Sequence, residues 1–224
     1  VISPIASLLS SSATDGNVSA RSGPKHLLCT PSGVHKGRLQ EVDLVKTDLF
    51  GRAVEPRQKA TSEIRMHLAV YEERADVQAV VHAHPAYAIA LSVAGVSLEP
   101  GFVSESVIAL GTILTVPYAS PTSADVAAAV RPHVSRANAL ILERHGTLTL
   151  GGSVEQAYIR TEILEHTAKI VAIARAVGGA LPLADEEVAR LRDIAVELGV
   201  EPLPDETDDV VQIVAERVLR RLKG

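Results

Sequence analysis

Apolar residues recur along the chain at two spacings, one typical of strands and one typical of helices. Short runs rich in β-branched residues and bounded by Gly, Pro or Ser predict strands at residues 26–30, 41–52, 76–84, 112–119 and 137–151, the last broken at 144–146. Apolar positions three and four apart predict helices at residues 61–74, 85–95, 120–134, 153–179, 185–199 and 205–222. Strands and helices therefore alternate through the middle of the chain, and its end is helical.

This alternation predicts an α/β fold in one domain over residues 1–224, with a helical tail from about residue 179. A length of 224 residues fits one domain with an appendage. No uninterrupted apolar run reaches about 18 residues, so we expect no membrane span. The opening segment VISPIASLLSSSAT is apolar but has no basic region before it, and we do not interpret it as a signal peptide.

Composition narrows the class of partner. Hydrophobic residues make up 46% of the chain and aromatics 3%, so aliphatic side chains must fill the core. The formal net charge is −5 and no basic run stands out, which argues against nucleic acid. The one cysteine excludes a disulfide within the chain and a multi-cysteine zinc site, and it suits a cytoplasmic location.

Two histidines interrupt the apolar stretch VVHAHP. His82 and His84 are two residues apart on a predicted strand, so both can face the same way, and Pro85 ends that strand. His145, in ERHG, also lies where a predicted strand breaks, and three imidazoles at strand ends could form a metal site with an open position. The alternative is that His82 and His84 are histidines at the edge of the core, bonded to backbone. His67 follows Glu63 by four residues and shares its helix face. His67 could orient Glu63 or could simply pack in the core, and both roles stay open.

Several stretches in this order, DGNVSAR, TPSG, SEIRMHLAVY, VVHAHP, VPYA and ERHG, resemble the class II aldolase/adducin family over about residues 15–169. Within that family the chain is most similar to the aldolases that act on L-fuculose 1-phosphate. The resemblance implies a three-layer α/β/α sandwich around a mostly antiparallel sheet. It also implies a homotetramer with active sites at subunit interfaces, and cleavage of a ketose 1-phosphate to dihydroxyacetone phosphate and an aldehyde.

The resemblance also implies roles for single residues. His82, His84 and His145 fall on the zinc ligands, although another divalent metal could replace Zn²⁺. Glu63 falls on the acid/base glutamate. The family's phosphate pocket maps to Asn17, Ser32, Gly33, Thr61 and Ser62. Hydroxyls and backbone N–H groups at the start of a helix suit a phosphate, which supports Thr61 and Ser62 in particular.

The chain departs from the family at one functional position. The aldolases donate a tyrosine across the interface to protonate the leaving aldehyde, and here Phe102 stands at the corresponding place in EPGFVSES. Phenylalanine cannot transfer a proton. Glu105, three residues later, is a candidate second acid/base or a plain surface carboxylate, and Tyr118 of VPYA is a further candidate.

Other activities of the scaffold therefore stay open: decarboxylation of a sugar-acid phosphate, dehydration of a thiosugar phosphate, or 4-epimerisation of a pentulose phosphate. The epimerase is disfavoured because no additional Asp is evident near the HAH strand. The alternative of another class is a non-catalytic interaction module like the adducin head, which would not need the three histidines and Glu63 that this chain retains.

Overall fold

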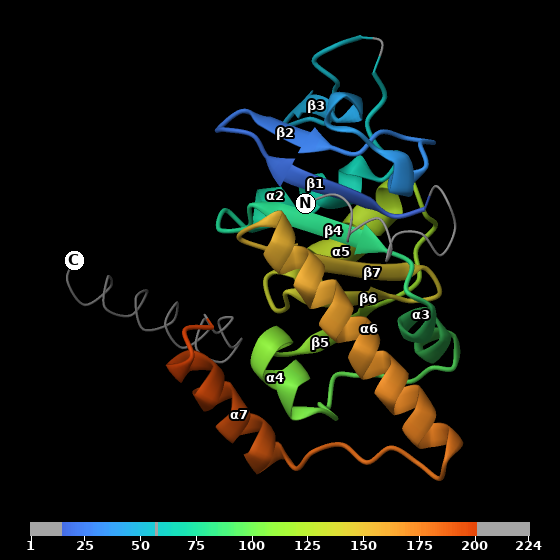
Figure 1. Ribbon diagram of the computed structural model, residues 1–224, viewed down its shortest axis with the longest axis vertical. Coiled ribbons are helices and arrows are strands. Elements are labelled where there is room, and N and C mark those ends of the chain that lie inside the picture. Colours follow the sequence, from blue (N-terminus) through green and yellow to red (C-terminus); the bar gives the residue numbers. More distant parts are fainter. Residues whose placement is uncertain (1–14, 57, 201–224) are drawn as a thin grey trace, which may run out of the picture.

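The computed structural model describes residues 15–56 and 58–200. Within them, seven strands form one sheet in the order β3-β2-β1-β4-β7-β6-β5 (Figure 1). Only β5 and β6 pair in parallel; the other neighbours are antiparallel, so the prediction of a mostly antiparallel sheet is confirmed. The strands are β1 (Asn17–Arg21), β2 (His26–Cys29), β3 (Val45–Asp48), β4 (Ala79–Ala83), β5 (Ile113–Val116), β6 (Ala139–Leu142) and β7 (Gly146–Gly151).

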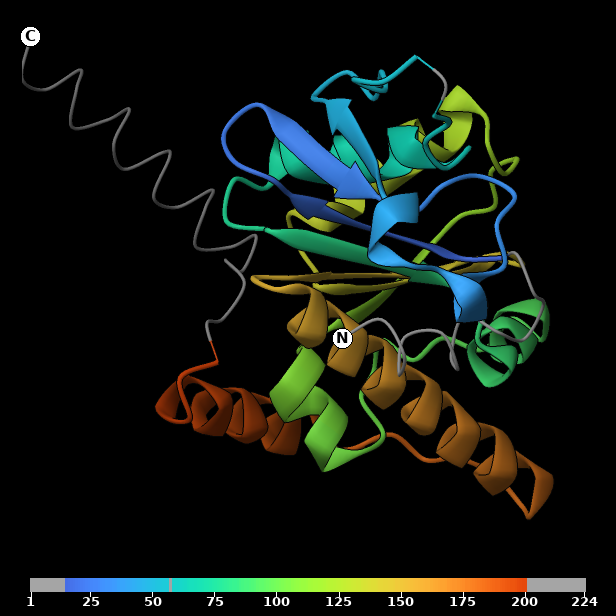
Figure 2. The same ribbon diagram turned by 45° about the horizontal axis from the view of Figure 1, so that its top comes forward.

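Helices cover both faces of this sheet, as predicted for a three-layer sandwich. One face carries α2 and α5, and the other carries α6 with α3 and α4, while α7 packs against α4 (Figure 2). Two 3-10 helices lie between β2 and β3. The helices are η1 (Lys36–Arg38), η2 (Glu41–Asp43), α2 (Ile64–Glu73), α3 (Ala86–Val93), α4 (Ser104–Leu110), α5 (Ala124–Val134), α6 (Val154–Ala176) and α7 (Asp185–Glu197).

The alternation of side chains along the strands separates two cores. On β6, Leu140 and Leu142 face the helices α2 and α5, whereas Ala139 and Ile141 face α3 and α6. All four side chains are buried, because this strand is covered on both sides. A strand buried on both faces has no polar side to expose, which explains the continuous apolar run that predicted it.

The predicted helix at 61–74 begins three residues later than expected. The helix α2 starts at Ile64 with Glu63 at its N-cap position, and the preceding turn is closed by Ile64 N–H donating to the Thr61 carbonyl at 3.2 Å. The Thr61 hydroxyl accepts from the Glu63 N–H at 3.3 Å. Thr61 therefore stabilises the turn before the helix, and Glu63 stands at the helix start.

Other differences concern short or unplaced segments. Helix α4 has no counterpart among the predicted elements, and β1 is visible in the sequence only as the strand-like VSAR after Asn17. The predicted helix at 205–222 and the opening segment 1–14 lie outside the described residues. Among the helices of residues 15–200, none combines the length and apolarity needed to cross a bilayer.

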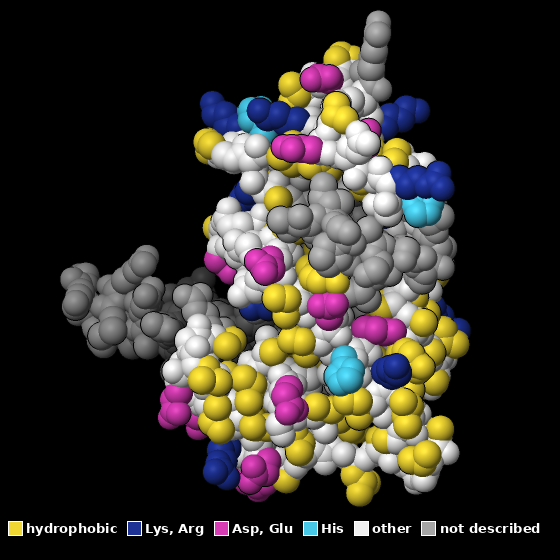
Figure 3. Space-filling model, in the orientation of Figure 1, with side chains coloured by type: hydrophobic (Ala, Val, Ile, Leu, Met, Phe, Trp, Pro, Cys, Tyr) yellow, Lys and Arg dark blue, Asp and Glu magenta, His cyan; other side chains and the backbone are white. Residues whose placement is uncertain are grey.

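Helix α6 also carries apolar side chains on its outer surface. Ile159, Ile170 and Ile173 are 44%, 37% and 50% exposed. The space-filling view shows hydrophobic side chains gathered over the lower half of this face of the molecule, where α6 and α7 lie (Figure 3). The outer layer of the sandwich is therefore only partly polar.

Candidate active site

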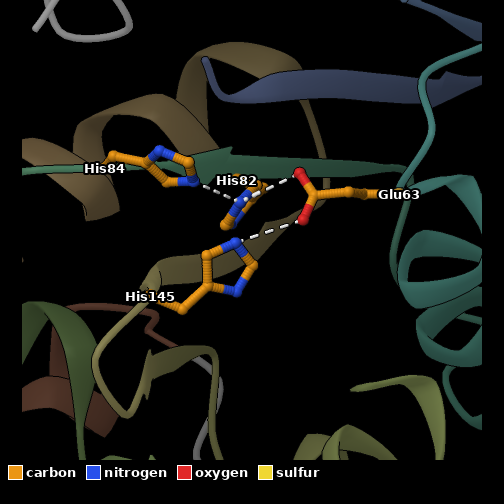
Figure 4. A group of neighbouring side chains, drawn as sticks. All are labelled: Glu63, His82, His84 and His145. Carbon is orange, nitrogen blue, oxygen red and sulfur yellow. Dashed lines mark hydrogen bonds and ion pairs between the residues drawn. The ribbon is translucent and has the colours of Figure 1, made fainter. Parts of the chain in front are cut away.

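Three imidazoles meet at one edge of the sheet. His82 lies in β4 and His84 just after its end, while His145 lies in the turn that joins β6 to β7. The ring centroids are 4.7 Å apart for His82 and His84, 4.8 Å for His82 and His145, and 5.1 Å for His84 and His145 (Figure 4). These rings come together because β7 pairs with both β4 and β6, which places the turn beside the end of β4.

The turn that carries His145 has a tightly specified backbone. Arg144 adopts the left-handed conformation with φ 57°, uncommon for a residue other than glycine, and its N–H donates to the Ser92 hydroxyl at 3.0 Å. Gly146 follows, and a Cβ there would lie 2.4 Å from the Ala83 carbonyl oxygen and 2.7 Å from the His84 ring. Only glycine allows the hairpin to approach β4 so closely.

Glu63 reaches the same point from the start of α2. Its Oε2 lies 3.2 Å from His82 Nε2, and its Oε1 lies 3.2 Å from His145 Nε2. Burial opposes the ionisation of Glu63, but its contacts with His145 and His82 and the hydrogen bond from Asn17 outweigh it and hold its pKa well below the ordinary value. A carboxylate, rather than a carboxylic acid, therefore faces the imidazoles.

The hydrogen bonds of His82 and the lowered pKa of His84 suit a cation between these two rings. His82 Nδ1 donates to the Thr147 carbonyl at 2.8 Å, which leaves the lone pair on Nε2 in the neutral ring. That Nε2 is 2.9 Å from His84 Nε2 as well as close to the Glu63 carboxylate. Burial, followed by the charges on His82 and His145, lowers the pKa of His84 to about 4, so His84 is neutral near pH 7.

Lone pairs and a carboxylate that face one another repel unless a proton or a metal ion lies between them. The candidate ligand atoms of Glu63, His82, His84 and His145 all lie within 4.8 Å of one another. Imidazole nitrogens and a carboxylate oxygen are donors that Zn²⁺ accepts. The residues present therefore fit a divalent metal, which the cluster could hold.

Contacts behind the ligands orient their rings. The Thr147 carbonyl fixes His82, and the Asp15 carboxylate lies 3.5 Å from His84 Nδ1. A hydrogen-bonded carbonyl or carboxylate behind a histidine is the usual way to fix its ligating nitrogen. Asp15 was not among the predicted site residues. It stands in DGN, two residues before Asn17, which lies opposite His82 in the pairing of β1 with β4.

Four of the five predicted phosphate-pocket residues lie on two adjoining segments. Ser32 N–H donates to the Lys59 carbonyl, and Thr61 N–H donates to the Thr30 carbonyl, both at 3.1 Å. These bonds bring Ser32 and Gly33 beside Thr61 and Ser62. Thr61 is buried, whereas Ser32, Gly33 and Ser62 are exposed.

Asn17, the fifth residue of that set, lies against the acid/base candidate instead. Its Nδ2 donates to Glu63 Oε2 at 2.8 Å and its Oδ1 lies 2.6 Å from His67 Nε2. Only 3% of Asn17 is exposed. His67, for which packing and orientation were both open, is therefore hydrogen-bonded toward Glu63 through Asn17.

The residues considered for the second acid/base role lie outside this cluster. Glu105 is exposed on α4, which packs against α6 and α7. Phe102 packs against the core formed with α3 and α6. Tyr118 follows β5 and is 57% exposed, and its N–H donates to Glu143 Oε2 at 3.1 Å, so its backbone is tied to the strand end before His145.

Comparison with known proteins finds relatives in one family. Residues 8–172 match the family model described as class II aldolase and adducin N-terminal domain. An L-fuculose phosphate aldolase of Methanococcus maripaludis is 37% identical over 155 residues, which are 69% of this chain and 83% of the relative. A 3-oxo-tetronate 4-phosphate decarboxylase of Haemophilus influenzae is 32% identical over 160 residues, covering 69% of this chain and 75% of the relative.

A solved structure agrees with these sequence relatives. An L-fuculose 1-phosphate aldolase superposes with a TM-score of 0.76 at 28% identity, over 86% of this chain and 93% of that one. The likeness therefore extends over most of the described chain.

Proposed function

Since the chain belongs to the class II aldolase and adducin family, we propose that it cleaves a ketose 1-phosphate to dihydroxyacetone phosphate and an aldehyde. The substrate would be of the L-fuculose 1-phosphate type, as the names of the M. maripaludis relative and of the solved aldolase suggest together. The observation that carries the proposal is the convergence of Glu63 and three imidazoles on one point. A cytoplasmic location is part of the same proposal.

His82, His84 and His145 are the residues that would hold the metal, with Zn²⁺ as the expected ion. A divalent ion bound there supplies a Lewis acid for the carbonyl and hydroxyl oxygens of the substrate. The contacts from Thr147 and Asp15 orient the rings of His82 and His84 for this task.

Glu63 is the proposed catalytic base. Glu63 is ionised at neutral pH, so Oε1 or Oε2 is available to accept a proton from the dihydroxyacetone phosphate unit. Ser32, Gly33, Thr61 and Ser62 would bind the phosphate through hydroxyls and backbone N–H groups, and Asn17 through its second amide N–H. A fixed phosphate holds the reacting carbon at one distance from Glu63.

We propose a homotetramer with active sites at subunit interfaces. Glu105 is exposed on α4 and could serve as the second acid/base across such an interface. The exposed isoleucines of α6 supply apolar surface for a contact between subunits. Light scattering on the purified protein measures the mass directly, and a monomer at micromolar concentration would remove the interface from the proposal.

The central experiment is a substrate panel with Glu63→Gln as the test variant. Ketose 1-phosphates and sugar-acid phosphates are incubated with the metal-loaded protein, and dihydroxyacetone phosphate is detected by a coupled reduction. Because Gln cannot accept the proton, we expect kcat to fall by at least about 100-fold while metal content stays near that of the wild type. Turnover that persists in Glu63→Gln would show that another group is the base.

One relative supports a second candidate. The H. influenzae relative is named a decarboxylase of a sugar-acid phosphate, and Phe102 in place of the tyrosine weakens the aldolase assignment. Release of carbon dioxide from a 3-oxo-tetronate phosphate in the same panel would move the assignment to decarboxylation. Dehydration of a thiosugar phosphate and 4-epimerisation of a pentulose phosphate need their own substrates and product analysis, and the epimerase gains from Asp15 beside His84.

Metal content distinguishes the enzyme from the non-catalytic alternative. An adducin-like interaction module has no need of the ion. We expect close to one equivalent of zinc for each chain after purification without chelators. Much less than one equivalent, with no activity recovered on adding divalent ions, would favour the module.

A further inference from the structure

Behind Glu63, four buried polar side chains form a continuous hydrogen-bonded row. Glu63 Oε2 accepts from Asn17, whose Oδ1 lies 2.6 Å from His67 Nε2. On the other side of that ring, His67 Nδ1 lies 2.7 Å from the Ser19 hydroxyl, which lies 2.9 Å from the Tyr71 hydroxyl. The row is Glu63–Asn17–His67–Ser19–Tyr71, and it leads away from the metal cluster into the layer between β1 and α2.

The direction of every hydrogen bond in the row follows from one fact. A carboxylate only accepts, so Asn17 must present its Nδ2 to Glu63 and its Oδ1 to His67. His67 then carries its proton on Nε2 and accepts on Nδ1, so the Ser19 hydroxyl must donate to it. Tyr71 in turn donates to Ser19. Burial, followed by the charge on His82, lowers the pKa of His67 to about 3, which agrees with a neutral ring.

The row is also shielded and anchored. His67, Ser19, Asn17 and Tyr71 are 0%, 1%, 3% and 7% exposed. Arg21 closes the far end: its Nη2 donates to the Tyr71 carbonyl at 2.9 Å and its guanidinium lies 4.8 Å from the centre of the tyrosine ring. Buried polar groups cost free energy unless they are paired, and in this row each is paired with the next.

The spacing of the residues explains how the row is built. Asn17 and Ser19 alternate on β1 and point to the same face of the sheet, while Glu63, His67 and Tyr71 recur every four residues along α2. One strand face and one helix face therefore interlock through polar side chains. The surrounding layer is otherwise the apolar core of α2 and α5.

We infer that His67, Ser19 and Tyr71 are positioning residues, which act through Asn17 to hold the Glu63 carboxylate in one orientation at the metal cluster. The inference rests on the proposed role of Glu63 as the base. A hydrogen bond to one carboxylate oxygen keeps the carboxylate at a fixed distance from the reacting carbon. A small displacement of the carboxylate would lower the reaction rate strongly. Asn17 has a second N–H on Nδ2, so this contact leaves room for phosphate binding, and Asn17 is left unchanged in the test.

The activity test uses His67→Leu and His67→Gln. Leu removes both ring contacts, and we expect a roughly 10–100-fold fall in kcat with KM within about threefold of wild type, because orientation of the base affects the transition state more than substrate binding. Gln retains an N–H that can reach Asn17 Oδ1, and we expect it to restore most of the loss. Ser19→Ala should give a smaller fall of the same kind.

Thr167→Val serves as the matched control. Its hydroxyl is buried on α6 and donates to a backbone carbonyl, far from Glu63 in the sequence and without a contact to the row. Each kcat is divided by the folded, metal-loaded fraction, so a loss of stability alone does not lower it. If His67→Leu keeps kcat within about twofold of wild type, or if Gln is no better than Leu, the row has only a structural role.

A second measurement tests the predicted direction of the hydrogen bonds in the row and does not depend on catalytic turnover. Two-bond ¹H–¹⁵N spectra of the full chain with labelled histidine report which ring nitrogen of His67 carries the proton. We expect the neutral Nε2–H form, and a neutral Nδ1–H form or a doubly protonated ring at pH 7 would overturn the inference. If no ketose 1-phosphate is cleaved by the wild type, the proposed function fails, while these spectra still test the row.

Discussion

Gly146 shows at the scale of single residues how sequence and site are connected. It is the first residue of β7, directly after His145, and pairs with Leu142 of β6 where the Ala83 carbonyl of β4 leaves no space for a Cβ. Neighbouring Arg144 accepts an unfavourable backbone conformation so that His145 can turn inward. The position of the third histidine thus depends on a residue that has no side chain.

We expect Gly146→Ala to damage both stability and metal binding. The added Cβ would meet backbone at 2.4 Å, so the hairpin must move away from β4. The expected cost is roughly 2–4 kcal/mol of unfolding free energy, together with a lower zinc content, measured by urea unfolding and by atomic emission.

Gly152→Ala is the matched control for this prediction. At Gly152 a Cβ would meet only the Gln156 side chain at 3.5 Å, an ordinary contact. A Gly146→Ala protein as stable and as metal-rich as Gly152→Ala would contradict the close approach of the two backbones.

Residue types predicted the membership of the site better than its connections. The residues themselves single out His82, His84 and His145 as candidate ligands, the family resemblance adds Glu63, and the structure brings all four together. The contact from Asn17 to Glu63 was not foreseen, because it depends on the pairing that sets Asn17 opposite His82. The role of His67 stayed open for the same reason, since a helix position alone does not reveal the strand beside it.

At the scale of elements, α3 shows how the metal-ligand segment is held. It begins at Ala86, two residues after His84, and no side chain of its own caps it. Glu165 of α6 supplies the cap instead, accepting from the N–H groups of Tyr87 at 3.0 Å and Ala88 at 2.9 Å. The carboxylate also complements the positive end of the helix dipole.

We expect Glu165→Ala to cost about 1–2 kcal/mol of unfolding free energy, because two helix N–H groups lose their acceptor. Urea unfolding at neutral pH measures this. Glu162→Ala is the control, since Glu162 is exposed one turn earlier on α6 and bonds only the Tyr158 hydroxyl. Equal stability of the two variants would show that water replaces the cap.

The periodic elements were predictable, and the short ones were not. Long helices such as α6 and strands such as β4 repeat their pattern often enough to stand out. Helix α4 has seven residues and follows Pro100 and Gly101, so the sequence there resembles a turn. Its helical state reflects packing against α6 and α7, which local sequence does not contain.

At the scale of the whole molecule, the metal cluster joins both halves of the sheet. His82 and His84 come from the end of β4, His145 from the hairpin of β6 and β7, and Glu63 from α2. A ligand that binds only the folded state stabilises it. Metal should therefore stabilise the entire fold and not only the edge of the sheet.

We expect zinc at about 100 times its dissociation constant to add roughly 2.7 kcal/mol. For a chain of this length that corresponds to a rise in Tm of roughly 5–10 °C. Thermal unfolding with zinc and with a chelator measures the difference. The rise should vanish in His145→Ala and persist in His166→Ala, because His166 is exposed on α6 and outside the cluster. A rise that survives in His145→Ala would place the ion elsewhere.

The order of the strands was beyond the reach of sequence reasoning on the residues themselves. The alternation of elements favours an α/β fold, but it does not reveal that β7 lies between β4 and β6 or that β1 borders β4. The family resemblance supplied the layered architecture, which the structure confirms. Which strands neighbour one another is decided by long-range packing, so single-sequence patterns leave it open.

Because β7 lies between two strands that precede it in the sequence, the sheet and the histidine cluster can be completed only late in translation. When the ribosome has added His82 and His84, it still has roughly 60 codons to read before it reaches His145. Until His145 is added, the nascent chain has only two of the three proposed ligands and would bind zinc weakly. The zinc ion proposed for this cluster would therefore be loaded only when the sheet is complete, and a shortage of zinc would leave fully folded chains without metal.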